Sequence, residues 1–362
     1  MTALAGIVTN SASGRDIRRL VTRASVFPNA EKSAMVQRTL AALGAAGVER
    51  VLVMTDLGGI AAGVLRARRR AARDTAAWPE VEFLDLPLTE TASDTTMAVR
   101  AMVERGVRAI VVLGGDGTNR VVAGACGEVP IVSLSTGTNN VFPELREATV
   151  AGLAAGLVAA GRVAAGAACR RNKMLVVDGG GRRELALVDV CATTHAAVAA
   201  RALWEAHSLR ALFVTFAEPD AIGLSAIAGL VHPVSRDEPW GLALELAPPA
   251  RARLRVRAPI APGLVVDVGV DSTTPMAPGE RWPLPAGTGV IALDGEREIE
   301  PNGTQPTVRL ELGGPRTIDV RRTLRLAAED GLLHDGAVIV PPGPPTTQRP
   351  PGHEEEDSWL LN

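Results

Sequence analysis

Two patterns of apolar residues alternate along the first 138 positions of the chain. Short continuous apolar runs are typical of strands buried in a parallel sheet, whereas apolar side chains recurring every three or four positions are typical of helices packed on such a sheet. Strands are expected at residues 4–9, 48–54, 81–86, 107–113 and 130–134, and helices at residues 31–46, 61–73, 91–105 and 119–126. Because strand and helix follow one another regularly, the pattern predicts βαβ units and an α/β domain with a parallel sheet.

Beyond residue 138 the pattern changes. An alanine- and glycine-rich stretch at residues 148–169 predicts a buried helix rather than a membrane span, since Arg162 interrupts it and its side chains are small. Short apolar runs separated by glycine and proline turns then predict an antiparallel, β-rich and sandwich-like domain. These runs lie at residues 173–178, 184–190, 211–216, 242–246, 253–257, 264–270, 289–293 and 307–312.

The sequence therefore predicts three parts. Residues 1–138 are expected to form the α/β domain. Residues 139–335 are expected to form a linking helix and the β-rich domain, and the last helix, residues 320–329, is expected to pack back on the first domain. Residues 336–362 are rich in proline and acidic side chains, which is typical of a disordered tail.

Composition excludes several classes of function. The 362 residues carry a formal net charge of −2, so bulk charge does not draw the chain to nucleic acid or to an anionic membrane. Five tryptophans, five phenylalanines and no tyrosine are too few rings for stacking on single-stranded nucleic acid. The only lysines, Lys32 and Lys173, lie outside any P-loop pattern, and the protein-kinase signatures are absent.

The cysteines and the first residues bear on the compartment. Cys126, Cys169 and Cys191 are odd in number and widely spaced, which does not indicate a disulfide framework or a zinc site. The first residues have no basic lead and only a short apolar run, unlike a signal peptide. We therefore expect a cytoplasmic protein with neither a membrane nor a nucleic-acid partner.

The strongest chemical signal is the segment Gly114-Gly-Asp-Gly-Thr118, which follows a strongly apolar strand and opens a helix. At the carboxyl end of a strand, glycines let backbone N–H groups approach an anion, and the helix N-terminus adds partial positive charge. A glycine-rich segment alone is also consistent with a simple tight turn. Asp116 argues against that alternative, because a carboxylate among phosphate-binding glycines is unfavourable unless it holds a metal ion or accepts a proton, as phosphoryl transfer requires.

Two further loops are expected beside this one, because the carboxyl ends of neighbouring parallel strands meet at one edge of the sheet. Both loops offer hydroxyl, amide or guanidinium groups for phosphate and sugar oxygens. The side chains concerned are Asn10, Ser13 and Arg15 after the first strand, and Thr136, Thr138, Asn139 and Asn140 after the fifth. Each loop alone is also consistent with a polar turn or a helix cap.

Together these segments resemble the superfamily of NAD kinases and of diacylglycerol and sphingosine-type lipid kinases. Gly114–Thr118 matches its GGDG[T/S] hallmark, Asn10–Gly14 its N-P-x-S-G-like loop, and Asp294–Glu296 its late D-G-[E/Q] segment. Within the superfamily, Ser135–Pro143 and Ile222–Gly229 look most like the branch named for acetoin catabolism protein X. The resemblance covers nearly all of the chain except the tail. It implies an N-terminal α/β nucleotide-binding domain, a C-terminal sandwich-like acceptor domain and a site in the cleft between them.

The resemblance also implies roles for individual residues. Asp116 matches the aspartate credited with activating the acceptor hydroxyl or organising Mg²⁺, and Asp294 and Glu296 match the late catalytic carboxylates. Asp116 and Asp294 are the expected metal ligands, and Asp189 and Ser225 are expected to bind the acceptor. The expected nucleotide- and phosphate-binding positions are Asn10, Ser13, Gly14, Arg15, Gly114, Gly115, Gly117, Thr118, Thr136, Thr138, Asn139 and Asn140.

The chain departs from NAD kinases on the acceptor side. NAD kinases carry an Asn-Glu or Asn-Asp pair that grips the acceptor, whereas the corresponding strand here, Leu187–Cys191, offers only Asp189. Their Thr-Gly-Ser-Thr-Ala-Tyr segment is absent, and Gly223–Gly229 occupies a similar place. Phosphoryl transfer is therefore better supported than NAD as the acceptor.

The sequence thus favours a Mg²⁺-dependent kinase that transfers a phosphoryl group from ATP to a hydroxyl of NAD or an NAD-like acceptor. A lipid or small-polyol kinase of the same superfamily and a nucleotide-binding regulator without catalysis are the alternatives. The expected partners are small-molecule nucleotides, and relatives imply a homodimer or tetramer. Whether Asp116 or Glu296 acts as the base is left open.

Overall fold

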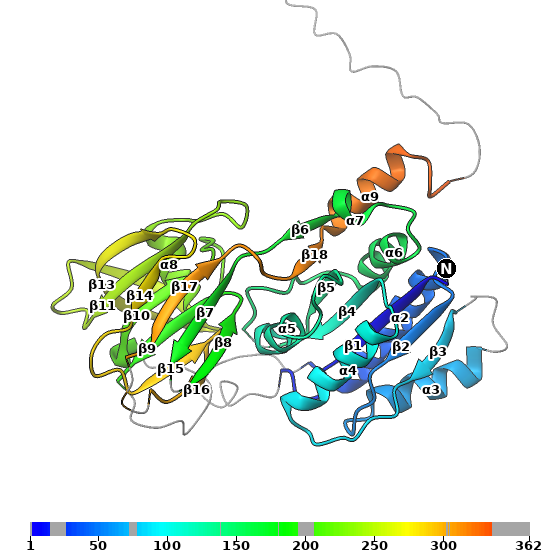
Figure 1. Ribbon diagram of the computed structural model, residues 1–362, viewed down its shortest axis with the longest axis horizontal. Coiled ribbons are helices and arrows are strands. Elements are labelled where there is room, and N and C mark those ends of the chain that lie inside the picture. Colours follow the sequence, from blue (N-terminus) through cyan, green and yellow to red (C-terminus); the bar gives the residue numbers. More distant parts are fainter. Residues whose placement is uncertain are drawn as a thin grey trace, which may run out of the picture.

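The protein consists of two lobes joined by a pair of antiparallel strands (Figure 1). The computed structural model describes residues 2–14, 27–71, 78–137, 139–179, 181–194, 206–301, 303 and 305–334. The expected tail therefore lies outside the described residues, as do Arg15 and Thr138.

The first lobe contains a seven-stranded sheet in the order β3-β2-β1-β4-β5-β18-β6. Strands β1 to β5 and β18 run parallel, and only β6 is antiparallel to its neighbour. The chain moves outward from β1 through β2 to β3 and returns to place β4 on the other side of β1, so β1 and β4 flank the point where the strand order reverses. The strands and helices are β1 (Leu4–Thr9), α2 (Asn29–Ala45), β2 (Arg50–Val53), α3 (Ile60–Ala71), β3 (Glu80–Phe83), α4 (Ala92–Glu104), β4 (Ala109–Gly114), α5 (Asp116–Ala123) and β5 (Ile131–Ser135).

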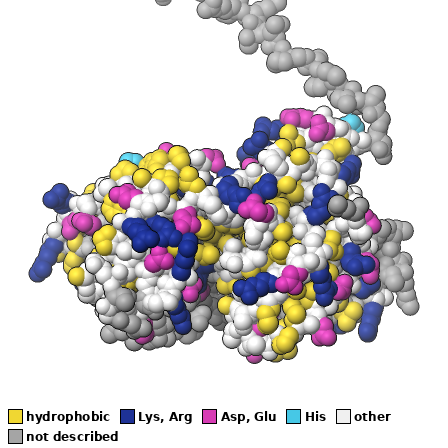
Figure 2. All heavy atoms as spheres, in the orientation of Figure 1, with side chains coloured by type: hydrophobic (Ala, Val, Ile, Leu, Met, Phe, Trp, Pro, Cys, Tyr) yellow, Lys and Arg dark blue, Asp and Glu magenta, His cyan; other side chains and the backbone are white. Residues whose placement is uncertain are grey.

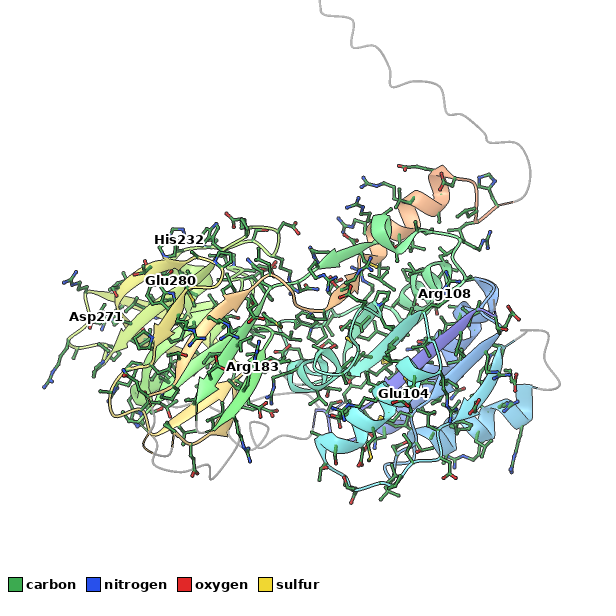
Figure 3. The ribbon with its side chains drawn as sticks, in the orientation of Figure 1. Glu104, Arg108, Arg183, His232, Asp271 and Glu280 are labelled. Atoms are coloured by element: carbon green, nitrogen blue, oxygen red, sulfur yellow. The ribbon has the colours of Figure 1, made fainter. Side chains whose placement is uncertain are left out.

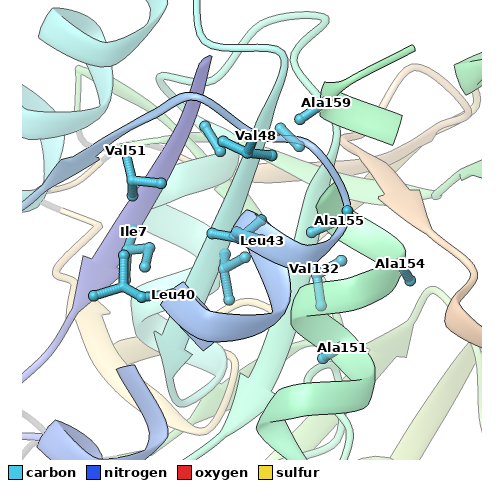
Figure 4. Packing of buried hydrophobic residues seen from close by; sticks show 14 of the residues in the cluster. Ile7, Leu40, Leu43, Val48, Val51, Val132, Ala151, Ala154, Ala155 and Ala159 are labelled. Atoms are coloured by element: carbon cyan, nitrogen blue, oxygen red, sulfur yellow. The ribbon is translucent and has the colours of Figure 1, made fainter. Parts of the chain in front are cut away.

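Alternate side chains of these strands build a separate core on each face of the sheet, as the strand period of two requires. On one face Ile7 of β1 packs with Leu40 and Leu43 of α2 (Figure 4). On the other face Val8 packs with Met102 of α4. Because both faces of the sheet are covered, apolar side chains follow one another along its strands.

The alanine-rich helix α6 (Ala148–Ala159) lies against α2. A Cβ atom added to Gly156 would lie 2.5 Å from Cβ of Ala46, and one added to Gly152 would lie 3.0 Å from Cα of Thr39. Small side chains are therefore what allow the two helix backbones to approach so closely. No helix among the described residues has the length and apolar content needed to cross a membrane.

The α/β lobe also takes in residues from the second half of the chain. β6 (Cys169–Arg171) and β18 (Arg316–Ile318) extend its sheet, with the short helix α7 (Ala165–Ala168) before β6, and α9 (Val320–Glu329) packs on the same face as α6. The lobe is thus completed by segments that the sequence pattern assigned to the second part. β18 pairs with β5, whose outer edge would otherwise present unpaired backbone N–H and C=O groups.

The second lobe is the antiparallel sandwich that the sequence predicts. A seven-stranded sheet, β12-β13-β11-β10-β9-β15-β16, faces a four-stranded sheet, β14-β17-β7-β8, across a core that contains Phe213 and Leu310. Helix α8 (Ser225–Val231) covers the other face of the larger sheet. The strands are β7 (Met174–Gly179), β8 (Arg182–Ala186), β9 (Asp189–Thr193), β10 (Leu209–Val214), β11 (Gly241–Ala247), β12 (Leu254–Ala261), β13 (Leu264–Met276), β14 (Arg281–Pro283), β15 (Val290–Leu293), β16 (Glu296–Ile299) and β17 (Thr307–Glu311). A short 3₁₀ turn, Ala206–Ser208, precedes β10.

The surface carries charge of both signs. On the face shown in Figure 2, basic and acidic side chains are interspersed over both lobes and do not gather into a patch of one sign. This distribution agrees with the net charge of −2.

Candidate active site

The segment between β4 and α5 carries the glycine-rich motif. Gly114 ends β4, Gly115 stands at the N-cap and Asp116 begins α5. A Cβ on Gly114 would lie 2.5 Å from Cβ of Thr118, and a Cβ on Gly115 would lie 2.7 Å from Oδ1 of Asn140. Glycine is therefore needed here to make room for two polar side chains of the site, and it leaves the backbone N–H groups of the helix N-terminus accessible.

The three loops that the sequence predicts to be neighbours meet at the carboxyl ends of β1, β4 and β5. Asn10 Nδ2 donates a hydrogen bond to Thr118 Oγ1 at 2.9 Å, and the Thr136 N–H donates to Gly114 O at 3.1 Å. The hydroxyl oxygens of Ser13 and Thr136 lie 2.9 Å apart. These bonds join the loops into one polar surface at the point where the strand order reverses, which is where α/β proteins bind ligands.

The first loop turns sharply at Gly14. Its φ of +75° is left-handed, and a Cβ there would also meet Thr136 O at 3.0 Å. Both features favour glycine at this position.

The ammonium group of a buried lysine binds the backbone of the same loop. Lys32 of α2 is fully buried, and its ammonium group donates to the carbonyl oxygens of Asn10 at 2.9 Å, Ser11 at 3.3 Å and Ser13 at 2.7 Å. A cation bound to three loop carbonyls fixes the shape of the loop. Its charge also favours anions on the opposite side of the loop.

Asp116 is largely buried, with 7% of its surface exposed, and faces the segment that follows β5. Its carboxylate accepts the N–H of Val141 at 3.0 and 3.1 Å and the N–H of Phe142 at 2.8 Å. Two backbone donors fix the orientation of this carboxylate. Asp116 therefore both shapes the loop after β5 and places a negative charge at the wall of the cleft described below.

The late Asp-Gly-Glu segment forms a tight hairpin between β15 and β16. Asp294 and Gly295 have φ of +50° and +75°, as a two-residue turn of this kind requires. The buried Asp294 carboxylate accepts the N–H groups of Leu187 at 3.0 Å, Val188 at 2.8 Å and Asp189 at 3.3 Å. Asp294 thus locks the hairpin to the start of β9.

The carboxylate of Asp294, in the second lobe, faces an arginine of the first lobe. Burial raises the pKa of its carboxyl to about 6, and the guanidinium of Arg120 and the backbone donors act in the opposite direction. Arg120 belongs to α5, and its Nε lies 3.8 Å from Asp294 Oδ2. The helix that begins with Asp116 therefore also carries the cation that faces the hairpin of the second lobe.

Two further carboxylates approach the same place. The carboxylate of Glu296, at the start of β16, lies 3.4 to 3.5 Å from the position that a Cβ on Gly117 would take. Asp189 is buried, and its Oδ1 accepts the N–H of Gly295 at 3.3 Å. Glu296 thus lies beside the glycine-rich loop, and Asp189 lies beside the turn that carries Asp294.

A narrow cleft, partly open to solvent, separates these groups. Three of its lining residues are acidic, four are aliphatic, and none of the described lining residues is histidine or aromatic. They are Asp116, Asn139, Val141, Asp189, Ile222, Gly223, Leu224, Ile260, Asp294 and Gly295. Among the described lining residues, carboxylates are therefore the groups that can exchange protons. His232 is exposed on the β-rich lobe beside Trp240 (Figure 3).

Of the polar residues Asn139, Asn140 and Ser225, only Asn139 lines the described part of the cleft. Asn139 lines it and donates from Nδ2 to Ile260 O at 3.3 Å, which connects the loop after β5 to the second lobe. Asn140 lies behind the loop, where its Nδ2 donates to Ser135 Oγ at 2.7 Å. Ser225 is fully buried at the start of α8, and the preceding Gly223 and Leu224 line the cleft instead.

The carboxylates of this cleft suit a metal ion that arrives with a nucleotide. The described residues contain no group of three or more carboxylate, imidazole or thiolate side chains placed to hold a metal ion by themselves. Mg²⁺ bound through nucleotide phosphates needs only one or two protein carboxylates, which Asp116 and Asp189 can supply. Asp294 is less suited, because its oxygens face three backbone N–H groups and Arg120.

Three residues that support the site have no motif in the sequence. Lys32 and Arg120 lie on helices without any local pattern that marks their roles, and Arg236 lies in a loop of the second lobe. The only available signal was rarity, since one of the two lysines of the chain lies in this helix. The contacts of all three depend on segments distant in the sequence.

Comparisons with known proteins match both lobes of the chain. The family model described as the ATP-NAD kinase N-terminal domain matches residues 6–163, and the one described as the acetoin catabolism protein X C-terminal domain matches residues 172–312. The acetoin catabolism protein X of Cupriavidus necator (strain ATCC 17699) is 44% identical over 335 residues, which cover 91% of this chain and 93% of that protein.

Proposed function

Because this chain belongs to the acetoin catabolism protein X family, with an ATP-NAD kinase N-terminal domain, we propose that it transfers a phosphoryl group from ATP to an alcohol bound between its lobes. The observation that carries the proposal is the meeting of two carboxylate motifs. Asp116 of the glycine-rich loop lines the same cleft as the Asp294 turn, and Glu296 lies over Gly117. A site that only bound phosphates would gain nothing from this concentration of negative charge.

The donor nucleotide would bind to the surface formed by the three loops. The N-terminus of α5 and the glycines before it offer backbone N–H groups to phosphate oxygens. Asn10, Ser13 and Thr136 add amide and hydroxyl groups, and Lys32 adds positive charge from below. Mg²⁺, when bound with ATP at Asp116 and Asp189, would neutralise charge on the transferred group.

The protein's own residues would orient the acceptor and remove its proton. In the reaction, the acceptor oxygen forms a bond to the γ-phosphorus, the bond from that phosphorus to the bridging oxygen breaks, and the acceptor proton moves to a carboxylate. We assign that proton to Glu296, since Asp116 already accepts two backbone N–H groups and Glu296 is only partly buried above Gly117. Asp116 then acts at the phosphoryl group.

NAD is the first acceptor to test, because the N-terminal domain is that of the ATP-NAD kinases. A second candidate has support from one observation. Ile222, Leu224 and Ile260 give the cleft an aliphatic wall without any described aromatic ring, which also suits a small alcohol with an apolar part.

The test supplies purified protein with ATP, Mg²⁺ and either NAD or a panel of small alcohols and lipids, and measures ADP release together with the phosphorylated product. Glu296→Gln and Asp116→Asn should each lower kcat by a factor of about 10² or more. Glu245→Gln, an exposed carboxylate of β11, is the matched control and should keep full activity. Tight nucleotide binding with no transfer to any acceptor would reject the kinase proposal in favour of a non-catalytic regulator.

A further inference from the structure

A single arginine of the second lobe reaches the loop that Asp116 holds. Arg236 lies between α8 and β11, and its guanidinium donates to Val141 O at 2.5 Å and to Phe142 O at 3.3 Å. The N–H groups of the same two residues donate to Asp116. An anion and a cation therefore bind opposite ends of the same short stretch of backbone.

We propose that Arg236 is a positioning residue for Asp116, acting across the lobes through the Val141–Phe142 backbone. The expected effect of Arg236 on kcat rests on the proposed function, whereas its effect on the orientation of Asp116 does not. Hydrogen bonds polarise one another when they form a chain, so a cation on the carbonyl side strengthens the bonds that the N–H groups make to a carboxylate. Arg236 thus helps to orient Asp116 without contacting the substrate.

The surroundings of Arg236 restrict it to this geometry. Its guanidinium lies 3.9 Å from the centroid of the Phe216 ring and 5.8 Å from that of Phe142, and Glu218 lies 3.6 Å from its Nε. Burial lowers the pKa of the guanidinium, and the nearby Glu218 and Asp116 carboxylates act in the opposite direction. The planar group is held between rings and carbonyls, a role for which lysine has the wrong shape.

The loop that carries Arg236 is itself anchored by a buried cation. Lys173, just after the crossing from the first lobe, donates from Nζ to Ser235 O at 2.9 Å and to Trp240 O at 2.8 Å. These two carbonyls lie on either side of Arg236 in the sequence. Both lysines of the chain therefore serve to fix loops at the site, Lys32 in one lobe and Lys173 in the other.

This arrangement makes the orientation of Asp116 dependent on contact between the lobes. If the lobes separated, Arg236 would leave the carbonyls of Val141 and Phe142, and these two residues would keep their N–H bonds to Asp116 without the cation on the carbonyl side. The three loops proposed to bind the nucleotide therefore belong to the first lobe alone, whereas the orientation of Asp116 also depends on the second lobe.

The experiment compares Arg236→Ala and Arg236→Lys with Arg170→Ala. Arg170 pairs with Asp237 in the same loop at 3.4 Å, and its hydrogen bonds are not to Val141 or Phe142, so it is the matched control. We expect kcat to fall about 10²-fold in Arg236→Ala, as for other small misplacements of a catalytic group. The KM for ATP should change little, and Arg236→Lys should recover only part of kcat. Free guanidinium, added below denaturing concentrations, should rescue kcat in Arg236→Ala but not in Asp116→Asn.

A second measurement does not depend on activity. Hydrogen exchange at the amides of Val141 and Phe142 should be faster in both Arg236 variants than in the wild type, and unchanged in Arg170→Ala. Unchanged exchange in Arg236→Ala, or loss of kcat without guanidinium rescue in a folded variant, would overturn the inference. If the wild type phosphorylates no acceptor while exchange responds as expected, the proposed function fails and the coupling through Arg236 stands.

Discussion

Removing the buried ammonium group of Lys32 should loosen the first loop of the site without disturbing the sheet. The perturbation is Lys32→Met, which keeps most of the side-chain volume and removes the donor to the carbonyls of Asn10, Ser11 and Ser13. Asn10 O retains a bond from the Ser13 hydroxyl at 2.9 Å. Two carbonyl oxygens, those of Ser11 and Ser13, therefore lose their main donor.

The magnitude follows from those two oxygens. A buried acceptor left without a partner costs about 1–3 kcal/mol, which applies in full to Ser13 O and only in part to the partly exposed Ser11 O. Part of this cost is offset, because the variant no longer buries an ammonium group. We expect the free energy of unfolding to fall by about 1–3 kcal/mol, within the ordinary range of single substitutions.

The assay is urea unfolding combined with calorimetric titration of ATP. Affinity for ATP should weaken by at least about tenfold, equivalent to about 1.4 kcal/mol, because binding must then order the loop. Thr39→Val on the same helix is the control, since the buried Thr39 hydroxyl has no hydrogen-bond partner among the described residues and its loss should be nearly neutral. If Lys32→Met matched Thr39→Val in both measurements, the lysine would not hold the loop.

Three further predictions concern packing and titration. Gly156→Ala should lower the free energy of unfolding by about 1–3 kcal/mol, since its Cβ would lie 2.5 Å from that of Ala46; Gly166→Ala, which meets nothing within 4 Å, should not. Burial lowers the pKa of Lys173 from 10.5 to about 8, so the stability of the wild type relative to Lys173→Met should rise as pH increases from about 8 to 10.5. Burial raises the pKa of Asp294 from 3.8 to about 6, so in metal-free buffer the stability of the wild type relative to Asp294→Asn should fall as pH increases through that window.

Both titration predictions are checked by urea unfolding across the pH range. In the Lys173 window the unfolded chain binds more protons than the native state, and in the Asp294 window it binds fewer, which sets the opposite signs. A difference between wild type and variant that stayed flat across either window would contradict the corresponding assignment.

The secondary structure of the first lobe was largely predictable because its signals are local. The helix expected at residues 91–105 is α4 (Ala92–Glu104), whose N-cap Thr91 accepts the Ser93 N–H. The strand expected at residues 107–113 is β4. Short strands such as β6, β14 and β18 were not predicted, because strands of three residues carry too little periodicity to be recognised.

In the candidate site, too, some features could be predicted from the sequence and others could not. The loops after β1, β4 and β5 could be placed together from the sequence alone, since parallel strands bring their carboxyl ends to one edge. The burial of Ser225 and the contact of Asn140 with Ser135 could not be predicted, because both depend on the packing of the surrounding elements.

The amino-acid sequence by itself determined the βαβ order, the sandwich that follows it, and Asp116 as chemically unusual, because glycines, turns and apolar periods act over a few neighbouring positions. Asp294 and Glu296 were indicated by the family resemblance. Only the tertiary structure decided what those residues contact. Asp294 meets backbone amides 105 to 107 positions away, and Arg236 reaches the segment beside Asp116 from 94 and 95 positions away. Contacts of that range arise when the hydrophobic faces of the sheets and helices pack, and no local pattern of residues encodes them.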